Sequence, residues 1–216
     1  FLVKAVADST LHASISNQVE FFAVQNPIPQ YSYISSTSVS GDSVLITYLG
    51  DNSVGVSEVY LYRSFDNGIN FTRIDSEINP VFPITFHVLD AMPNERSSMY
   101  QVSVLDACGN QIAYSNVGKT ILLSVDNNDY ALKSLNWNSY IRWEVGVENY
   151  EVRVRQQNMN SFQNVVYLDS SFNSYFHKIN NFITPPFGGE VCYKIKALEL
   201  LNSFGEQGIS ESNEVC

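Results

Sequence analysis

The sequence predicts an all-β protein built of tandem β-sandwich domains, and three observations lead to this prediction. First, apolar and charged residues alternate over residues 193–197 (YKIKA), as in a strand with one buried face. Second, clusters of turn-forming residues separate such segments. Third, a strand, a loop and a returning Ser-Asn strand recur, with the Asn at positions 17, 116 and 213. The steps, 116 − 17 = 99 and 213 − 116 = 97, match the length of a small β domain.

The N-terminal part is predicted to contain a hairpin, a linker and a first complete domain. Residues 1–25 resemble the last hairpin, strands F and G, of a preceding domain, and residues 26–30 (NPIPQ) form a linker stiffened by two prolines. Residues 31–119 are assigned to the complete domain, with a hairpin turn at 66–68 (DNG). Its strands are predicted at 31–39, 44–48, 59–63, 71–74, 84–88, 100–105 and 114–121.

Residues 120–216 are assigned to a second complete domain. No proline-rich linker precedes it, because Gly118-Lys119-Thr120 passes directly from one domain into the next, so we expect a short joint with limited swivel. Leu135 and Trp137 share one face of its second strand, and apolar residues alternate with charged ones over 150–155. Further strands are predicted at 165–168, at 174–179 and in the tail 188–216.

The aromatic residues are expected to form the two cores, because seven short strands per unit indicate a β-sandwich that must be filled. Their positions fit a fibronectin type III-like (Ig-like) pattern. Its core aromatics would be Trp137 on the second strand (Tyr48 in the first domain), Tyr150 on the third, and Tyr193 or Tyr100 on the sixth.

The charge balance excludes several classes of partner. Twenty-two acidic against twelve basic residues give a net charge of −10, which disfavours nucleic acid and anionic membrane surfaces. No segment is long and apolar enough for direct membrane insertion. We interpret the charge as a solubility feature. Phe1 falls inside a strand pattern, so no signal peptide is expected here, and this says nothing about localisation.

Cys192 and Cys216 are predicted to form a disulfide. If Tyr193 faces Val215 across an antiparallel pair, the two cysteines face each other as well, and opposed Cβ atoms lie near disulfide distance. Closing this loop stabilises the fold by roughly 3.5 kcal/mol in the loop-entropy model. A disulfide would indicate an oxidising compartment, whereas the alternative is a pair of reduced surface thiols.

No cofactor, metal site or catalytic centre is predicted. The cysteines lack C-x-x-C spacing, and the three histidines are dispersed. Residues 66–70 and 126–129 resemble fragments of calcium loops but lack the closing Glu, so we interpret them as turns. Nucleophile, zinc-protease and phosphate-loop motifs are missing, and loop carboxylates such as Asp51, Glu95 and Glu206 are ordinary for a surface. The protein is not expected to be an enzyme.

Several phrases resemble one family more closely. Residues 137–152 (WNSYIRWEVGVENYEV) resemble a W-x-x-Y-x-x-W-x-x-G-V-x-x-Y-x-V signature. Residues 189–193 (GEVCY), 212–216 (SNEVC) and 106–110 (DACGN) resemble its cysteine elements. These phrases are similar to the last fibronectin-like repeats of gliding-motility-associated surface proteins of the Bacteroidota. In similar repeats a second Cys follows the last strand, but residues 126–129 contain none, so Cys108 is expected to be unpaired.

The resemblance implies a non-catalytic extracellular stalk of a large adhesin or gliding-motility protein. Such a stalk would precede a C-terminal sorting domain, and the protein would be exported by type IX secretion to the bacterial surface outside the outer membrane. The implied partners are neighbouring domains of the same chain, the secretion machinery and a surface anchor. Ser9 and Ser43 resemble the O-glycosylation acceptors of these bacteria, and Asn70-Phe71-Thr72 fits the N-glycosylation pattern.

Two alternative functions remain open. In a carbohydrate- or protein-binding module, loop aromatics would form a binding patch, for which the candidates are Tyr140, Trp143, Phe182 and Phe187. In an accessory spacer of a secreted hydrolase, a catalytic domain would lie elsewhere in the parent chain.

Overall fold

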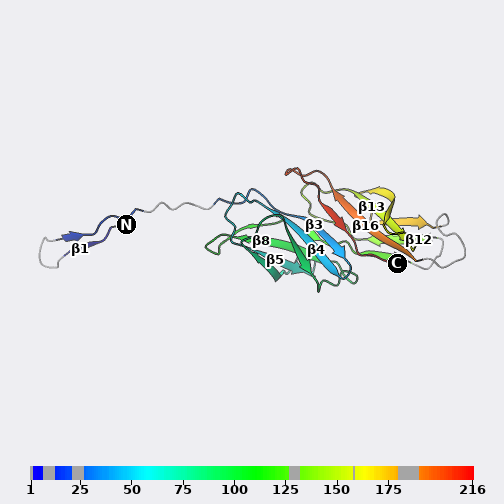
Figure 1. The fold of residues 1–216 in the computed structure, drawn as a ribbon, viewed down its shortest axis with the longest axis horizontal. Coiled ribbons are helices and arrows are strands. Elements are labelled where there is room, and N and C mark those ends of the chain that lie inside the picture. The colour runs from blue at the N-terminus through cyan, green and yellow to red at the C-terminus, as the bar shows by residue number, and fades with distance from the viewer. Residues whose placement is uncertain (1, 7–12, 21–26, 127–131, 158, 180–189) are drawn as a thin grey trace.

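The computed structural model describes residues 2–6, 13–20, 27–126, 132–157, 159–179 and 190–216. All the regular elements of this described part are β-strands, β1 to β17. They form a separate two-stranded hairpin and two β-sandwiches that lie against each other (Figure 1). The predicted all-β sandwich class is confirmed.

No described segment forms a helix that is both long and apolar enough to cross a membrane.

The first sandwich has a three-stranded and a larger sheet, with every strand pair antiparallel. The first sheet has the order β3 (Ser32–Ser40), β4 (Ser43–Gly50), β7 (Ile84–Val88). The second has the order β10 (Gly118–Lys119), β8 (Met99–Leu105), β5 (Glu58–Ser64), β6 (Thr72–Ile78), with β9 (Gln111–Tyr114) also paired to β8. This is the fibronectin type III-like arrangement, with A, B and E strands facing G, F, C and C′.

The second sandwich repeats this arrangement. Its first sheet has the order β11 (Leu123–Asp126), β12 (Leu132–Trp137), β15 (Ser174–Lys178). Its second has the order β14 (Gln163–Asp169), β13 (Val147–Gln156), β16 (Val191–Glu199), β17 (Ile209–Glu211). Equivalent strands therefore occupy equivalent places in both sandwiches.

Alternation along the strands fills the two cores. In β4 every second residue is fully buried while the residues between are half-buried, so one face of the sheet packs inward. All five predicted core aromatics are buried: Tyr48, Tyr100, Trp137, Tyr150 and Tyr193. The rings of Trp137 and Tyr150 meet edge to face with centroids 5.7 Å apart, a favourable geometry for aromatic pairs.

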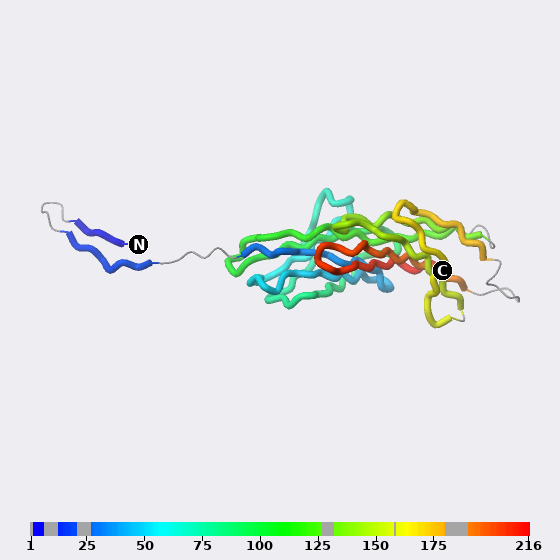
Figure 2. Tube along the Cα trace, turned by 90° about the horizontal axis from the view of Figure 1, so that it is seen from above, coloured from blue at the N-terminus to red at the C-terminus, as the bar shows by residue number. Residues whose placement is uncertain are grey.

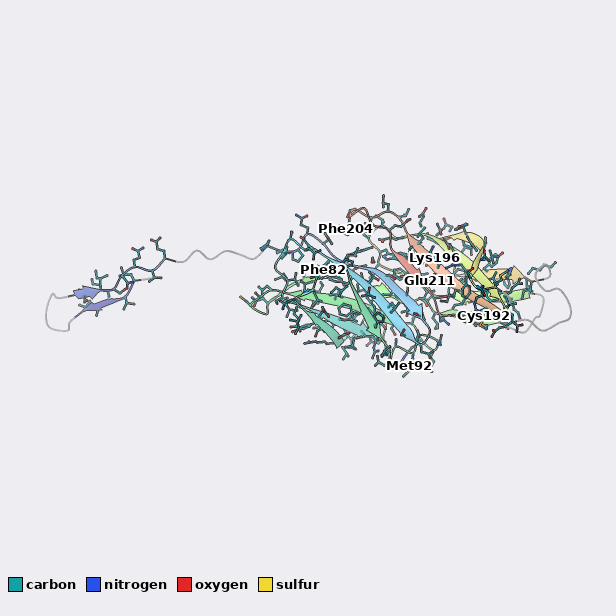
Figure 3. The ribbon with its side chains drawn as sticks, viewed as in Figure 1. Phe82, Met92, Cys192, Lys196, Phe204 and Glu211 are labelled. Atoms are coloured by element: carbon teal, nitrogen blue, oxygen red, sulfur yellow. A yellow bond between two sulfur atoms is a disulfide. The ribbon has the colours of Figure 1, made fainter. Side chains whose placement is uncertain are left out.

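The charged residues between these core positions form ion pairs on the outer face of the second sandwich. Lys196 contacts Glu151 across β16 and β13 at 3.2 Å, and Arg153 contacts Glu211 at 2.8 Å. Figure 3 labels Lys196 and Glu211 on this sandwich. The ion pairs are partly exposed, so each contributes little to stability. Oppositely charged side chains of neighbouring strands therefore lie beside each other on this face.

The last strand of the first sandwich differs from the prediction. A continuous strand was expected over 114–121, but the structure has β9 and β10 with residues 115–117 between them. Ser115 leaves the regular ladder because its Oγ, rather than a backbone carbonyl, accepts the N–H of Val102 at 2.8 Å. The Ser115 N–H donates to the Val102 carbonyl at 2.8 Å.

Asn116, next in the chain, connects the two sheets. Its Oδ1 accepts the Ile34 N–H at 2.6 Å, and its Nδ2 donates to the Ile34 carbonyl at 3.1 Å. In the second sandwich Asn213 makes the same pair of bonds to Leu123, at 2.6 and 3.1 Å. We call these two hydrogen bonds, made by the Asn of each Ser-Asn pair, the Ser-Asn bridge. The recurrence seen in the sequence thus joins the last strand of one sheet to the first strand of the other.

The N-terminal hairpin pairs β1 (Lys4–Val6) with β2 (Ala13–Ile15) and is exposed throughout its strands. Figure 1 shows it apart from the sandwiches. Ser16 accepts the Val3 N–H at 3.1 Å through Oγ and donates its own N–H to the Val3 carbonyl at 2.9 Å. These contacts match those that Ser115 makes with Val102.

Candidate functional site

The first strand of one sandwich lies beside the last strand of the other. Figure 2 shows the blue β3 running along the red β17. The Thr37 N–H donates to Ser210 Oγ at 2.9 Å, and the Glu211 N–H donates to Ser38 Oγ at 3.1 Å. Serine hydroxyls therefore replace the backbone carbonyls of a regular ladder, and each edge strand covers the other.

The loop between β12 and β13 continues this contact. Trp143 donates its indole N–H to the Ser35 carbonyl at 3.1 Å, and the Glu144 N–H donates to the Tyr33 hydroxyl at 3.1 Å. Thr37 Oγ1 lies 3.3 Å from the Tyr140 hydroxyl, to which it donates. We call residues 33–38, together with their partners at 140–144 and 199–211, the interdomain seam.

Glu199 is fully buried in the interdomain seam. Its carboxylate accepts hydrogen bonds from the Tyr33 hydroxyl, from the Gly208 N–H at 2.9 Å and from the Asn202 amide at 3.4 Å. Burial raises the pKa of the Glu199 carboxyl, and burial together with its bond to Glu199 raises the pKa of the Tyr33 hydroxyl. Three donors satisfy the carboxylate, as a buried charge requires.

Gly208 is required for the close approach of the two sandwiches. A Cβ added at this residue would lie 2.4 Å from the Ser35 carbonyl oxygen and 2.8 Å from Trp143 Nε1. Both atoms belong to the interdomain seam, so any side chain at this position would push the sandwiches apart.

The predicted aromatic binding patch is wrong for the two residues that the structure describes. Tyr140 and Trp143 are each only 4% exposed, and their ring centroids lie 3.9 Å apart within the second core. They are covered because the first sandwich packs over the loop that carries them. In an isolated second domain this loop would be exposed to solvent. Phe182 and Phe187 lie outside the described residues.

The predicted disulfide between Cys192 and Cys216 is present, with Cα atoms 3.9 Å apart. The register behind the prediction is also observed, since Tyr193 and Val215 exchange backbone hydrogen bonds of 2.8 and 3.1 Å. Cys192 is buried and Cys216 is exposed. Cys108 is free and exposed, as expected.

One cluster in the described part has the composition of a metal site. Its ligand atoms come from Glu190, Cys192 and Cys216 and lie within 4.8 Å of one another. Because the two cysteines are joined in a disulfide, they offer no thiolate to a metal ion.

The histidines and the proposed modification sites are dispersed. His177 is buried with its Nδ1 2.9 Å from the Tyr193 hydroxyl, and burial lowers its pKa, whereas His87 is exposed. Ser43 is half-buried and donates its hydroxyl to the Ser40 carbonyl at 2.8 Å. Ser9 and His12 lie outside the described residues.

A second feature, which the sequence interpretation missed, is a groove beside the interdomain seam with a volume of about 500 Å³. Segments far apart in the chain form it, so no local sequence signal marked it. Tyr31 and Phe82 come from the first sandwich, and Phe204 comes from the loop between β16 and β17. Figure 3 shows Phe82 and Phe204 near each other, in the half of the paired sandwiches that is nearer the N-terminal hairpin.

A scan against protein families found no match, and a search of the curated proteins found none either. Among solved structures, the chain is similar to the crystal structure of the chicken CNTN1 FN1-FN3 domains. The identity is 13% over 88% of this chain, with a TM-score of 0.32, and the match spans 63% of that chain. The fibronectin type III-like fold is assigned from the strand order and the paired sheets described above.

Proposed function

We propose that this chain is a non-catalytic extracellular spacer in which the two sandwiches act as one stiff unit. The interdomain seam carries this proposal. Domains joined in one chain move relative to each other by default unless their interface is extensive. Here Tyr33, Trp143 and Glu199 are buried between the sandwiches and hydrogen-bonded across the seam, so a change of the interdomain angle would break these hydrogen bonds and expose the two aromatic rings to water.

The location that we propose is the surface of a bacterium. The Cys192–Cys216 disulfide fits an oxidising, extracellular compartment. The signature at residues 137–152 supports a gliding-motility-associated or adhesin protein exported by type IX secretion.

The N-terminal hairpin supports a longer array. Ser16 contacts Val3 as Ser115 contacts Val102 and as Ser212 contacts Ile195. In both complete sandwiches this pattern belongs to the F and G strands. We therefore propose that β1 and β2, within the predicted hairpin of residues 1–25, belong to a further sandwich, because two exposed strands alone are at most marginally stable in water.

Small-angle X-ray scattering tests the stiff unit. The scattering curve of residues 27–216 should fit the single arrangement of Figure 1 for the unmodified chain. Gly208→Ala should broaden the distance distribution, because its Cβ meets the Ser35 carbonyl. Gly55→Ala is the matched control, since an added Cβ there meets nothing within 4 Å. An unmodified chain that already samples many interdomain angles would contradict the proposal.

A further inference from the structure

The groove beside the interdomain seam has an aromatic wall from both sandwiches. Tyr31 and Phe204 pack with ring centroids 5.1 Å apart, and Phe204 also packs on Tyr33 at 5.6 Å. Phe204 remains 39% exposed. One side of this aromatic pair is therefore open to a ligand.

Phe82, which is buried in the first core, also lines the groove and is held in place by two features. Asn52 binds the Phe82 backbone twice, accepting its N–H at 3.1 Å and donating to its carbonyl at 3.2 Å. The Phe82 ring lies directly on Gly50, where an added Cβ would come within 2.6 Å of it. This part of the groove is thus preorganised, which lowers the cost of binding.

Besides Asn52, whose amide is taken up by Phe82, two polar side chains of the groove have no partner among the described residues. The Gln30 amide and the Glu206 carboxylate border the groove, are exposed, and make no hydrogen bond or ion pair within the described ranges. The Glu206 backbone is nevertheless fixed, because its N–H donates to Asn202 Oδ1 at 2.9 Å. Lys and Arg are absent from the lining, as far as the described residues form it.

We infer that this groove binds a neutral oligosaccharide. The C–H face of a sugar ring can pack on Phe204 and Tyr31, while its hydroxyls donate to Glu206 and exchange hydrogen bonds with Gln30. The groove volume of about 500 Å³ lies within the range of small-molecule binding sites, which is roughly 300–1,000 Å³.

The other ligand classes fit the groove less well. A phosphate or an acidic sugar would meet the Glu206 carboxylate with no cation to balance it. An ammonium group could pair with Glu206 and lie over the open face of Phe204. It can only donate hydrogen bonds, however, whereas a sugar hydroxyl can pair with both the donor and the acceptor atoms of the Gln30 amide. A lysine-rich peptide is therefore the competing ligand of the test.

Calorimetric titration of the whole chain with cellohexaose, xylohexaose and mannohexaose tests this inference. At least one should bind, and Phe204→Ala and Gln30→Ala should each weaken binding about tenfold or more. Phe172→Ala is the control, because Phe172 is 50% exposed in the turn before β15, and it should leave the affinity unchanged.

Two results would overturn the inference. One is that none of the three saccharides binds, or that the variants bind as tightly as the unmodified chain. The other is that only a lysine-rich peptide binds and Glu206→Gln abolishes that binding. Gln30→Ala keeps the test valid if Phe204→Ala disturbs the seam, since the Gln30 side chain makes no hydrogen bond to the described residues. Neither result bears on the spacer, which scattering tests separately.

Discussion

Asp66 holds the turn between β5 and β6 through one carboxylate group. It accepts the N–H groups of Asn70 and Ile69 at 2.9 and 3.1 Å, and the Ser64 hydroxyl at 2.6 Å. The bond from the Asn70 N–H, followed by the bond from Ser64, lowers the pKa of Asp66 to about 2. The residues that resembled a calcium-loop fragment are in this structure a turn whose carboxylate is already occupied by donors from its own loop.

Asp66→Asn should therefore destabilise the chain in a pH-dependent way. A folded-state pKa below the ordinary 3.8 means that the stabilisation is complete above that pH and is lost as the pH falls toward about 2. The difference in urea midpoint between the unmodified chain and the variant should be largest at neutral pH and shrink in acid. Asp75→Asn is the control, since among the described residues the Asp75 carboxylate accepts a hydrogen bond only from the adjacent Ser76 N–H. A constant difference at every pH would contradict the prediction.

Asp106 and Asn202 hold two similar turns, at residues 106–110 and 202–206. The D-x-C-G-N residues 106–110 therefore form a turn and do not depend on a reaction of the cysteine. Asp106 Oδ1 accepts the N–H groups two and four residues later, at 2.9 and 2.8 Å, and Asn202 Oδ1 does the same at 3.1 and 2.9 Å. Gly109 and Gly205 follow with φ of 77° and 78°, which glycine adopts without strain. The D-x-C-G-N phrase thus needs its Asp and Gly, while Cys108 stays free.

At the level of strands, the Ser-Asn bridge explains why two sheets close into one sandwich. Asn213→Ala removes two hydrogen bonds and leaves the buried N–H of Leu123 without its acceptor. Loss of such a partner costs about 1–3 kcal/mol, so the free energy of unfolding from urea titration should fall by that amount.

Two matched variants check this prediction. Asn116→Ala removes the equivalent bonds to Ile34 and should cost a similar amount. Asn17→Ala lies in the exposed hairpin and should change the unfolding of the sandwiches by less than measurement error. An effect of Asn17→Ala equal to the other two would mean that the bridge is not the cause.

The disulfide makes a separate prediction for the end of β16. Cys192→Ser with Cys216→Ser should lower the free energy of unfolding by roughly 3.5 kcal/mol, mainly because the unfolded chain gains freedom. Reducing agent should lower the melting temperature of the unmodified chain and leave the double variant unchanged. Cys108→Ser, at a free exposed cysteine, should have no effect under either condition.

Most of the strands and their buried residues were predicted from the sequence, and the exceptions have physical causes. Alternation identified the core positions of β13 and β16, because burial on one face imposes a period of two. The break at Ser115 was missed because a side chain replaces the backbone there. The burial of Trp143 was missed because its partner, the Ser35 carbonyl, lies 108 residues away. The groove was missed for the same reason, since Tyr31 and Phe204 meet only after both sandwiches have folded.

For the molecule as a whole, the interdomain seam converts two repeats into one body. An exposed edge strand invites pairing with other chains, and here β3 and β17 cover each other through Ser38 and Ser210. The same contacts would keep the groove in one shape, because Tyr31 and Phe204 belong to different sandwiches. The proposed stiff spacer and the proposed ligand groove would thus depend on the same interface.

This coupling predicts that the two sandwiches unfold together. Separating them would break the hydrogen bonds of the Tyr33 hydroxyl with Glu199 and with the Glu144 N–H, and it would expose the buried rings of Tyr33 and Trp143 to water. Calorimetry of the unmodified chain should therefore show one transition whose calorimetric and van't Hoff enthalpies agree. Tyr33→Phe keeps the ring but removes both bonds, so it should lower the transition temperature. Gly208→Ala should split the transition in two, since its Cβ forces the sandwiches apart. Two resolved transitions in the unmodified chain would mean that the seam forms without coupling the domains.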